Sequence, residues 1–174
     1  MEFWIVYDQA TGEERWRGQG PVGASAHQSY PEGLGIMVVP QAVVQSPEID
    51  LDVLRDHLAR TIDTEAELIR RSFLTPGEGQ AMTYQRKEAE ARAWAIDNAA
   101  ATPFLNVEAA ARGMTLPELA AEVIQLADAW VVIGSAIEGL RMGAKTAIAR
   151  SATLSAVLLA ATVDWRKVAQ AANG

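Results

Sequence analysis

Few residues in this 174-residue chain have side chains suited to catalysis or metal binding. The only two histidines are His27, in a glycine-rich stretch, and His57, which stands among Asp52, Arg55 and Asp56. Neither has a second ligand at a metal-binding spacing such as H-x-x-x-H, and neither is accompanied by a nucleophile or an oxyanion donor. We therefore predict two surface histidines, no metal site and no bound cofactor.

The sequence contains other motifs that occur in enzymes, but their local sequence context excludes an enzymatic role for each. Residues 18–23 match the letters G-x-G-x-x-G, but a dinucleotide-binding loop must open a helix directly after a buried strand, and Pro21 interrupts this one. The Gly-Ser-Ala run at 134–136 lies within a helical pattern, where the strained nucleophile turn of a hydrolase cannot form. Acidic pairs such as Glu65 and Glu67 fall on different sides of a helix. The sequence predicts no enzyme.

Composition excludes further classes of function. The net charge of −7, from 15 basic and 22 acidic residues, argues against binding nucleic acid, which requires clustered Lys and Arg. The chain has no cysteine, so it has neither disulfides nor thiolate metal sites. Its N-terminus lacks the pattern of a signal peptide, and the apolar run at 152–163 is too short to span a bilayer. We expect a soluble protein without membrane insertion.

The long stretch from Leu116 to about residue 150 organises the helical part of the chain. Thr115, Pro117 and Glu118 form a helix start with a capping-box pattern. Apolar residues then recur at alternating steps of three and four, the heptad spacing of helices that pack along one another. The resulting seam comprises Leu116, Leu119, Val123, Leu126, Trp130, Ile133, Ile137 and Leu140. Such a helix would be roughly 45 Å long.

This seam has two interpretations. It can join copies of the chain into a homo-oligomer, in which case its mixture of Leu, Val, Ile and Trp does not select dimer or trimer. Alternatively, it can pack within the chain on the helices expected near residues 47–73 and 80–100, because short connections favour antiparallel neighbours. Both can hold, since a long helix has more than one face.

The first 45 residues predict a small antiparallel sheet. Strands are expected at 3–7, 13–17, 35–39 and 41–45, with Phe3, Ile5 and Tyr7 facing one side of the sheet. Such a sheet is barely stable alone, so another element must cover one face. The remainder, 46–174, predicts helices at about 47–73, 80–100, 107–112, 116–150 and 154–165. The fold class is therefore α+β, a small N-terminal sheet followed by a mainly helical region.

The aromatic residues divide into two groups. Trp94 and Trp130 lie on apolar helix faces, which favours a role in the core. Trp16 and Tyr30 belong to the β-rich part, and Trp16 stands between Arg15 and Arg17. Trp16 and Tyr30 either cover the sheet or form an exposed docking patch together with Arg15 and Arg17, because Tyr, Trp and Arg are enriched in binding hot spots.

Several motifs resemble a recurrent family of proteins of tailed bacteriophages. In that family a hairpin of the form VYD-x-x-TGE begins a small β domain, and a proline-glycine hinge precedes alanine-rich helices. The matching residues here are Val6 to Asp8, Thr11 to Glu13, Gly18, Pro21, the Pro-Glu-Gly of 31–33, Val38 to Pro40, the stretch 74–82, Tyr84, the run 87–91, and Asp164-Trp165. The resemblance spans most of the chain and implies no catalytic residues.

The resemblance implies a role among tail-fibre or tail-fibre-assembly proteins, located in the phage virion after synthesis in the bacterial cytoplasm. In the first interpretation the chain is a structural component that oligomerises through its seam and docks on other phage structural proteins through its β head. In the second it is an assembly chaperone that leaves the particle. A third, of a different class, is a receptor- or glycan-binding module that uses Trp16 and Tyr30.

Overall fold

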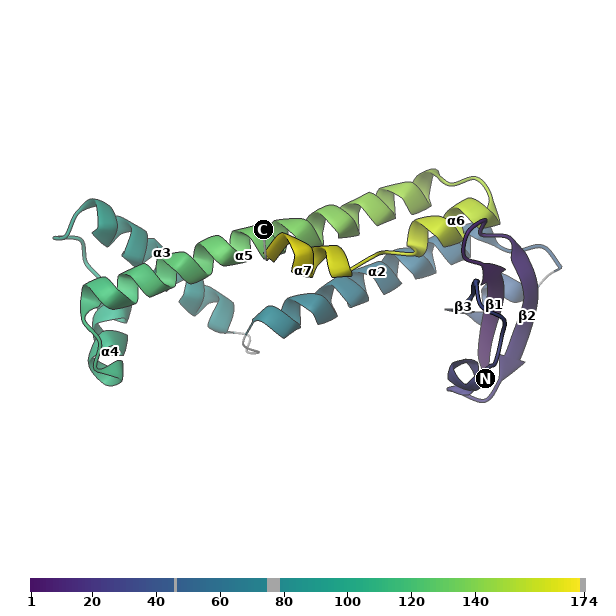
Figure 1. Ribbon diagram of the computed structural model, residues 1–174, viewed down its shortest axis with the longest axis horizontal. Coiled ribbons are helices and arrows are strands. Elements are labelled where there is room, and N and C mark those ends of the chain that lie inside the picture. Colours follow the sequence, from purple (N-terminus) through teal and green to yellow (C-terminus); the bar gives the residue numbers. More distant parts are fainter. Residues whose placement is uncertain (46, 75–78, 173–174) are drawn as a thin grey trace. The chain divides into compact units, whose positions relative to one another are not determined.

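The computed structural model describes residues 1–45, 47–74 and 79–172 (Figure 1). It confirms the predicted fold class, a small antiparallel sheet followed by a mainly helical chain. Contacts divide the chain into two compact units: unit 1 is Met1–Leu68 with Glu138–Trp165, and unit 2 is Ile69–Ile137 with Arg166–Gly174. This division differs from the boundary at residue 45, which marks a change from strand to helix.

The sheet in unit 1 contains β1 (Glu2–Asp8), β2 (Glu14–Gly20) and β3 (Leu34–Val39), with β1 in the centre and both neighbours antiparallel to it. The β1–β2 hairpin turns at Asp8, whose Oδ1 accepts hydrogen bonds from the backbone N–H of Ala10 (2.9 Å) and Thr11 (3.0 Å). Gly12 then adopts a φ of 72°, in the left-handed region that glycine tolerates best. The predicted turn is confirmed.

The prediction for the segment after β3 was wrong. Residues 41–45 were expected to form a fourth strand, but α1 (Gln41–Val44) is a single helical turn. Pro40 has an extended conformation, and its carbonyl accepts from the N–H of Val43 at 3.0 Å. A further short helix, η1 (Ala24–His27), lies between β2 and β3.

Helices cover one face of the sheet. Ile5 and Tyr7 belong to the same core as Leu54, Leu58 and Ile62 of α2 (Leu51–Phe73). Further members are Ile148, and Val157, Leu158 and Ala161 of α6 (Leu154–Ala161). Because successive residues of a strand face opposite sides, Trp4 and Val6 belong to the other face. The first helix, expected from about residue 47, begins only at Leu51. Asp50 caps α2 by accepting from the N–H of Asp52 and Val53.

Unit 2 packs α3 (Gln80–Ile96) and α4 (Pro103–Arg112) against the beginning of α5 (Leu116–Arg150). Its core consists of Ala91, Leu105, Ala109, Leu119, Ala120 and Val123. Two predicted boundaries were wrong here. The helix expected to reach residue 100 ends at Ile96, and α4 begins at Pro103 rather than near 107, because proline suits the first turn of a helix.

Helix α5 has the bounds that the sequence predicts. The capping box is confirmed: the N–H and hydroxyl of Thr115 both donate to Glu118 Oε2, at 2.9 and 2.7 Å. Gly134, Gly139 and Gly143 do not interrupt the helix. At the other end of the chain, the helix expected at 154–165 is shorter, because α6 ends at Ala161 and α7 (Arg166–Ala172) is separate.

Candidate functional site

The two ends of the predicted seam on α5 are covered by the chain itself. Leu119 and Val123, which are 0% and 9% exposed, belong to the core of unit 2. Further along the helix, Ile137 is completely buried. Leu116 and Leu140, at the extremes of the seam, are half-buried. Intramolecular packing, one of the two interpretations of the seam, therefore accounts for these portions of it.

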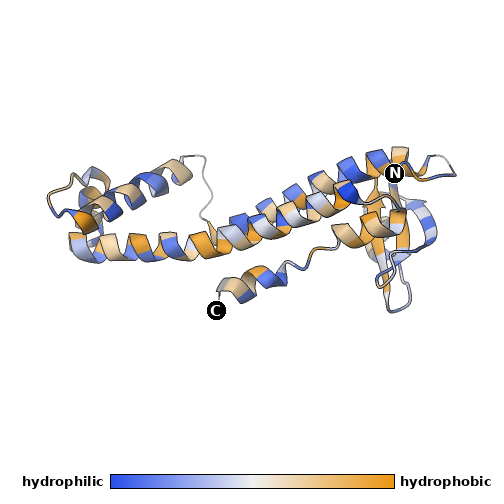
Figure 2. Ribbon diagram, turned by 90° about the horizontal axis from the view of Figure 1, so that it is seen from above, coloured by the Kyte–Doolittle hydropathy of each residue, from blue (hydrophilic) through white to orange (hydrophobic). Residues whose placement is uncertain are grey.

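The middle of the seam is different. Leu126 is 64% exposed, and Trp130 and Ile133 are only half-buried. No residue between 125 and 136 is buried, and we call this part of the helix the open segment of α5. Figure 2 shows that hydrophobic residues recur along α5, including its middle. A helix with this much apolar surface is normally covered by protein or by lipid.

The open segment also includes residues outside the seam. Val131 and Val132 are 60% and 47% exposed, and they point away from the stripe formed by Leu126, Trp130 and Ile133. Heptad spacing did not identify these two valines, because it selects one face only. The consecutive apolar run at 129–133 was the available signal. The segment is thus apolar around much of its circumference.

Electrostatically, the open segment is nearly neutral. Its single charged residue, Asp128, accepts a hydrogen bond of 2.6 Å from Arg92 Nη2. The Nε atom of Arg92 also lies 2.8 Å from Glu88 Oε1. Both hydrogen bonds raise the pKa of the Arg92 guanidinium, and the one to Asp128 contributes most. Trp130 lies over Gly134, where a Cβ would come within 3.3 Å of the indole Cε2. The surface therefore offers shape and apolar area rather than charge.

By length and composition, α5 would also suffice to cross a membrane. It is one helix of this kind in the described part of the chain, and only 17% of its most apolar window is buried. A core helix of a soluble protein can be equally long and apolar, but such a helix is mostly buried. The predicted absence of membrane insertion stays a prediction.

In the β head, Trp16 is the most exposed aromatic residue among those predicted for docking. Its side chain is 43% exposed, and in register it lies opposite Val6, on the sheet face that carries Trp4. Val38, which lies opposite Trp4 in the β1–β3 register and so on the same face, is 40% exposed. Tyr30 is half-buried in the loop before β3. In the described parts of the head, no hydrogen bond joins Tyr30 to Trp16.

The two arginines beside Trp16 are held by carboxylates. Arg15 Nη2 lies 2.8 Å from Asp8 Oδ2, and Arg17 Nε lies 2.8 Å from Glu14 Oε1. The hydrogen bond from Arg15, together with those from the turn N–H groups, lowers the pKa of Asp8 to about 2. These pairs partly neutralise the edge of β2. The docking patch predicted from sequence thus reduces to an apolar area around Trp16 and Val38.

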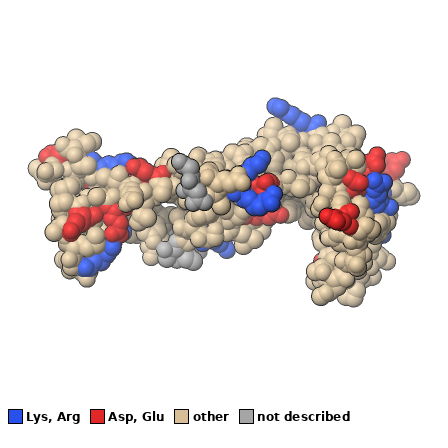
Figure 3. Space-filling view, in the orientation of Figure 1, with Lys and Arg blue, Asp and Glu red and all other residues tan. Residues whose placement is uncertain are grey.

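Neither histidine lies in a catalytic arrangement. His27 is exposed in η1, and His57 Nε2 is 3.2 Å from the carbonyl of Val38. Among the described residues, no three His, Cys, Asp or Glu side chains gather in a way that could hold a metal ion. On the face shown in Figure 3, acidic and basic side chains lie beside one another instead of forming large single-sign areas.

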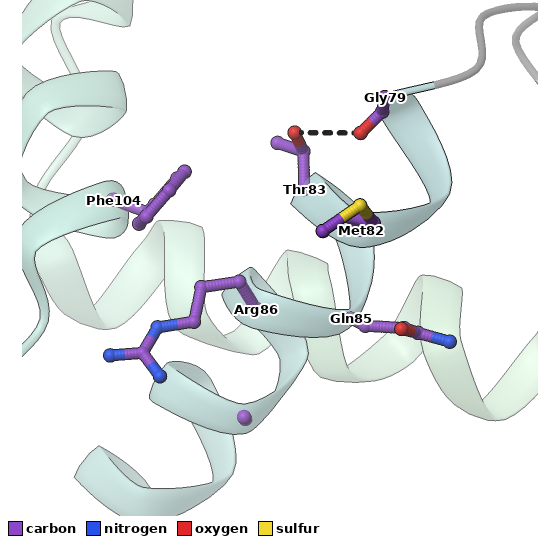
Figure 4. Close-up of a pocket in the computed structure, with 7 residues that line it drawn as sticks. Gly79, Met82, Thr83, Gln85, Arg86 and Phe104 are labelled. Atoms are coloured by element: carbon purple, nitrogen blue, oxygen red, sulfur yellow. Dashed lines mark hydrogen bonds between the residues drawn. The ribbon is translucent and has the colours of Figure 1, made fainter.

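A shallow hollow of about 670 Å³ lies between α3 and α4 (Figure 4). Met82, Arg86, Ala89 and Phe104 contribute to its lining. Beside it, the carboxylate of Glu90 is 3% exposed and accepts hydrogen bonds from the backbone N–H of Phe104 (2.9 Å) and Leu105 (3.2 Å). Glu90 therefore acts as a cap for the start of α4. This contact was not predictable from sequence, because the residues belong to different helices.

Comparison with protein-family models, with curated proteins and with solved structures finds no match to this chain.

Proposed function

We propose that this chain is a non-enzymatic structural protein of a tailed-bacteriophage particle, which self-associates through α5 and docks on other phage proteins through its β head. The observation that carries the proposal is the open segment of α5, in which Leu126 is 64% exposed and no residue is buried. The phage context rests on the VYD-x-x-TGE hairpin and the other matching motifs.

Self-association would cover this apolar surface. Exposed valine, leucine and isoleucine side chains favour association because burying apolar area releases about 25 cal/mol per Å². The single charge of the segment is paired within its own unit, so little desolvation of charge opposes contact. The spacing of Leu126, Trp130 and Ile133 suits packing against another helix.

Docking through the head is supported by a second exposed apolar area. Trp16 and Val38 lie on the sheet face opposite the helical core of unit 1. Exposed tryptophan is a frequent anchor in protein interfaces. The head and α5 would then provide two separate contacts, one to another phage protein and one to a further copy.

Sedimentation velocity over a wide concentration range tests the association. We expect the wild-type chain to form larger species as concentration rises, and Leu126→Asp to shift this transition to higher concentration while the fold is retained. Gln125→Asp is the matched control, because it adds the same charge at the neighbouring exposed position outside the seam. A wild-type chain that remains monomeric throughout would refute self-association.

The phage context needs a separate experiment, namely mass spectrometry of purified particles of the phage that encodes the chain. Recovery at a constant ratio to known tail proteins would support a structural role. Absence from intact particles, together with binding to a fibre protein in the producing cell, would refute it.

One observation favours a second candidate, an assembly chaperone that leaves the particle. The chain covers both ends of its own seam and exposes only a short apolar stretch, which suits a releasable contact better than a permanent bundle. Mass spectrometry of particles separates the two candidates, because a chaperone would be found in the cell lysate but not in the virion.

A further inference from the structure

We propose that the stretch from Trp130 to Ser135 is a hinge within α5, at which the helix opens locally while the packed parts of α5 before and after it keep their contacts. We call this stretch the weak run. It belongs entirely to unit 2 and lies inside the open segment. The inference concerns a conformational property of the free chain and goes beyond the proposed function.

The first observation is the composition of the weak run. It reads Trp-Val-Val-Ile-Gly-Ser, and none of these residues belongs to the strong helix formers Ala, Leu, Met, Glu, Gln, Lys and Arg. Elsewhere in α5, residues outside that group stand singly, apart from the pair Val123 and Ile124. The β-branched side chains lose χ1 freedom in a helix, and Gly134 loses the backbone freedom that glycine has in an unfolded chain. The weak run is therefore the stretch of α5 with the lowest intrinsic tendency to be helical.

The second observation is that packing does not compensate for this composition. Most of the stability of a helix in a protein comes from tertiary packing of its apolar face. Val131 and Val132 are 60% and 47% exposed, however, and no residue of the weak run is buried. The indole of Trp130 lies beside Gly134, but this cover belongs to the weak run itself and is lost when the run opens.

The third observation is a side-chain hydrogen bond that competes with the helix. The hydroxyl of Ser135 donates to the carbonyl of Val132 at 3.0 Å. In a regular α-helix the same carbonyl accepts from the N–H of residue 136. A serine hydroxyl that binds a carbonyl of the preceding turn slightly destabilises a helix and often bends it. Ser135 thus offers this carbonyl a second partner when the backbone hydrogen bond breaks.

Before and after the weak run, α5 is held by contacts that do not involve it. In unit 2, Leu119 and Val123 belong to the core. In unit 1, Ile148 belongs to the core and Arg141 forms an ion pair with Asp63. Opening of the weak run therefore sacrifices no core packing within either unit.

The population of the opened form follows from the helix–coil equilibrium. An interrupted helix has to be nucleated a second time beyond the break, which costs a factor of about 10⁻³. The weak run itself adds little that favours the helical form, because its residues propagate a helix poorly. We therefore expect the run to be open in roughly one molecule in a thousand. Unfolding of a whole unit should be rarer, since it also exposes the core.

Native-state hydrogen exchange of the full-length chain, measured by NMR at a concentration too low for association, tests the hinge. After correction for intrinsic rates, the amides of residues 131–135 should exchange at least about tenfold faster than those of Ala120 and Val123. Their exchange should also depend only weakly on added urea, because a local opening exposes little surface.

A pair of substitutions makes the test specific. The double variant Val131→Ala, Val132→Ala raises helix propensity at two exposed positions, and it should slow exchange within the weak run by roughly fivefold. Exchange at Ala120 and Val123 should stay unchanged. Val107→Ala is the matched control, because it makes the same replacement at a 73% exposed position of α4. It should leave exchange within the weak run unchanged.

Two results would overturn the hinge. One is exchange of the weak run at the rate of Ala120 and Val123, which would mean that the run opens only with the whole unit. The other is a double variant that slows exchange within the run no more than Val107→Ala does.

The same measurement at high concentration concerns the proposed function separately. Association through the open segment predicts slower exchange within the weak run as concentration rises. A rate that is independent of concentration would count against self-association and leave the hinge intact.

Discussion

The indole ring of Trp4 occupies the space that a side chain at residue 18 would fill. Gly18 lies opposite Trp4 in the β1–β2 register, and a Cβ placed on it would overlap the indole Nε1. Gly20 continues this arrangement, since its Cβ would come within 3.3 Å of Trp4 Cη2. Two glycines of the apparent nucleotide-binding motif therefore serve to bury a tryptophan, which is 4% exposed.

This arrangement predicts that Gly18→Ala destabilises the protein by about 1–3 kcal/mol, the usual cost of overfilling a packed site. Gly139→Ala is the control, because no atom lies within 4 Å of its Cβ position on α5. Alanine there should stabilise the helix by up to about 1 kcal/mol. Urea unfolding followed by circular dichroism measures both changes. Equal stabilities of the two variants would contradict the role of Gly18.

The two tryptophans of the sheet should respond differently to truncation. Trp16→Ala removes a side chain that is 43% exposed, so helicity and melting temperature should change little, while incorporation into particles is lost if the head docks. Trp4→Ala empties a buried site and should cost about 3–5 kcal/mol. Thermal melts and particle analysis of both variants provide the comparison. Normal incorporation of Trp16→Ala would leave Trp16 as sheet cover alone.

Glu90 should matter more to unit 2 than its neighbour Glu88. Glu90→Ala leaves the N–H groups of Phe104 and Leu105 without their acceptor, and an unsatisfied buried donor costs about 1–3 kcal/mol. Glu88→Ala removes an exposed pair with Arg92, for which about 0–1 kcal/mol is typical. Hydrogen exchange at Phe104 and Leu105 measured by NMR should accelerate only in the first variant. Unchanged protection there would show that water replaces the carboxylate at no cost.

Asp63 should contribute a pH-dependent stability to unit 1. Its carboxylate accepts hydrogen bonds from Lys145 Nζ (2.6 Å) and Arg141 Nη1 (2.5 Å). These contacts lower the pKa of Asp63 below the ordinary 3.8, and the one with Lys145 contributes most. A carboxyl whose pKa is lower in the folded state stabilises the fold above its unfolded pKa, and this stabilisation is lost as the pH falls through the folded value. Stability should therefore fall below about pH 4, and Asp63→Asn should reduce that fall.

Asp56→Asn provides the comparison for Asp63, since Asp56 is an exposed carboxylate on the same helix. Denaturant unfolding between pH 2 and pH 6 measures the three proteins. Identical pH profiles for wild type and Asp63→Asn would show that the ion pairs with Arg141 and Lys145 contribute nothing.

Local signals predicted several features well. The bounds of α5 follow from the capping box of Thr115 and Glu118 and from uninterrupted heptad spacing. The β1–β2 hairpin follows from Asp8, whose carboxylate accepts hydrogen bonds from the N–H groups of the turn, and from Gly12, which adopts the positive φ that the turn requires. In contrast, the single turn of α1 spans four residues, too few for a helical period to differ from alternation. Whether each of these elements could be predicted depended on how clear the signal from neighbouring residues in the sequence was.

The candidate site was predictable only in part. Heptad spacing locates the seam, but it cannot show that Leu119 and Ile137 are covered while Leu126 is exposed, because this depends on segments distant in sequence. The cap of α4 by Glu90 is a tertiary contact of the same kind. The start of α4 was misplaced in part for that reason, since the carboxylate that caps it belongs to another helix.

The tip of the hairpin rests against a part of the chain that is made much later. Gly12 lies against the backbone of Ser155, and the hydroxyl groups of Tyr7 and Thr162 lie 3.4 Å apart. On the ribosome, β1 to β3 emerge early, but the helix that completes their core follows only after α5. The core around Ile5 and Tyr7 therefore stays incomplete while α2 to α5 are made, and it closes only when Val157 and Leu158 of α6 arrive.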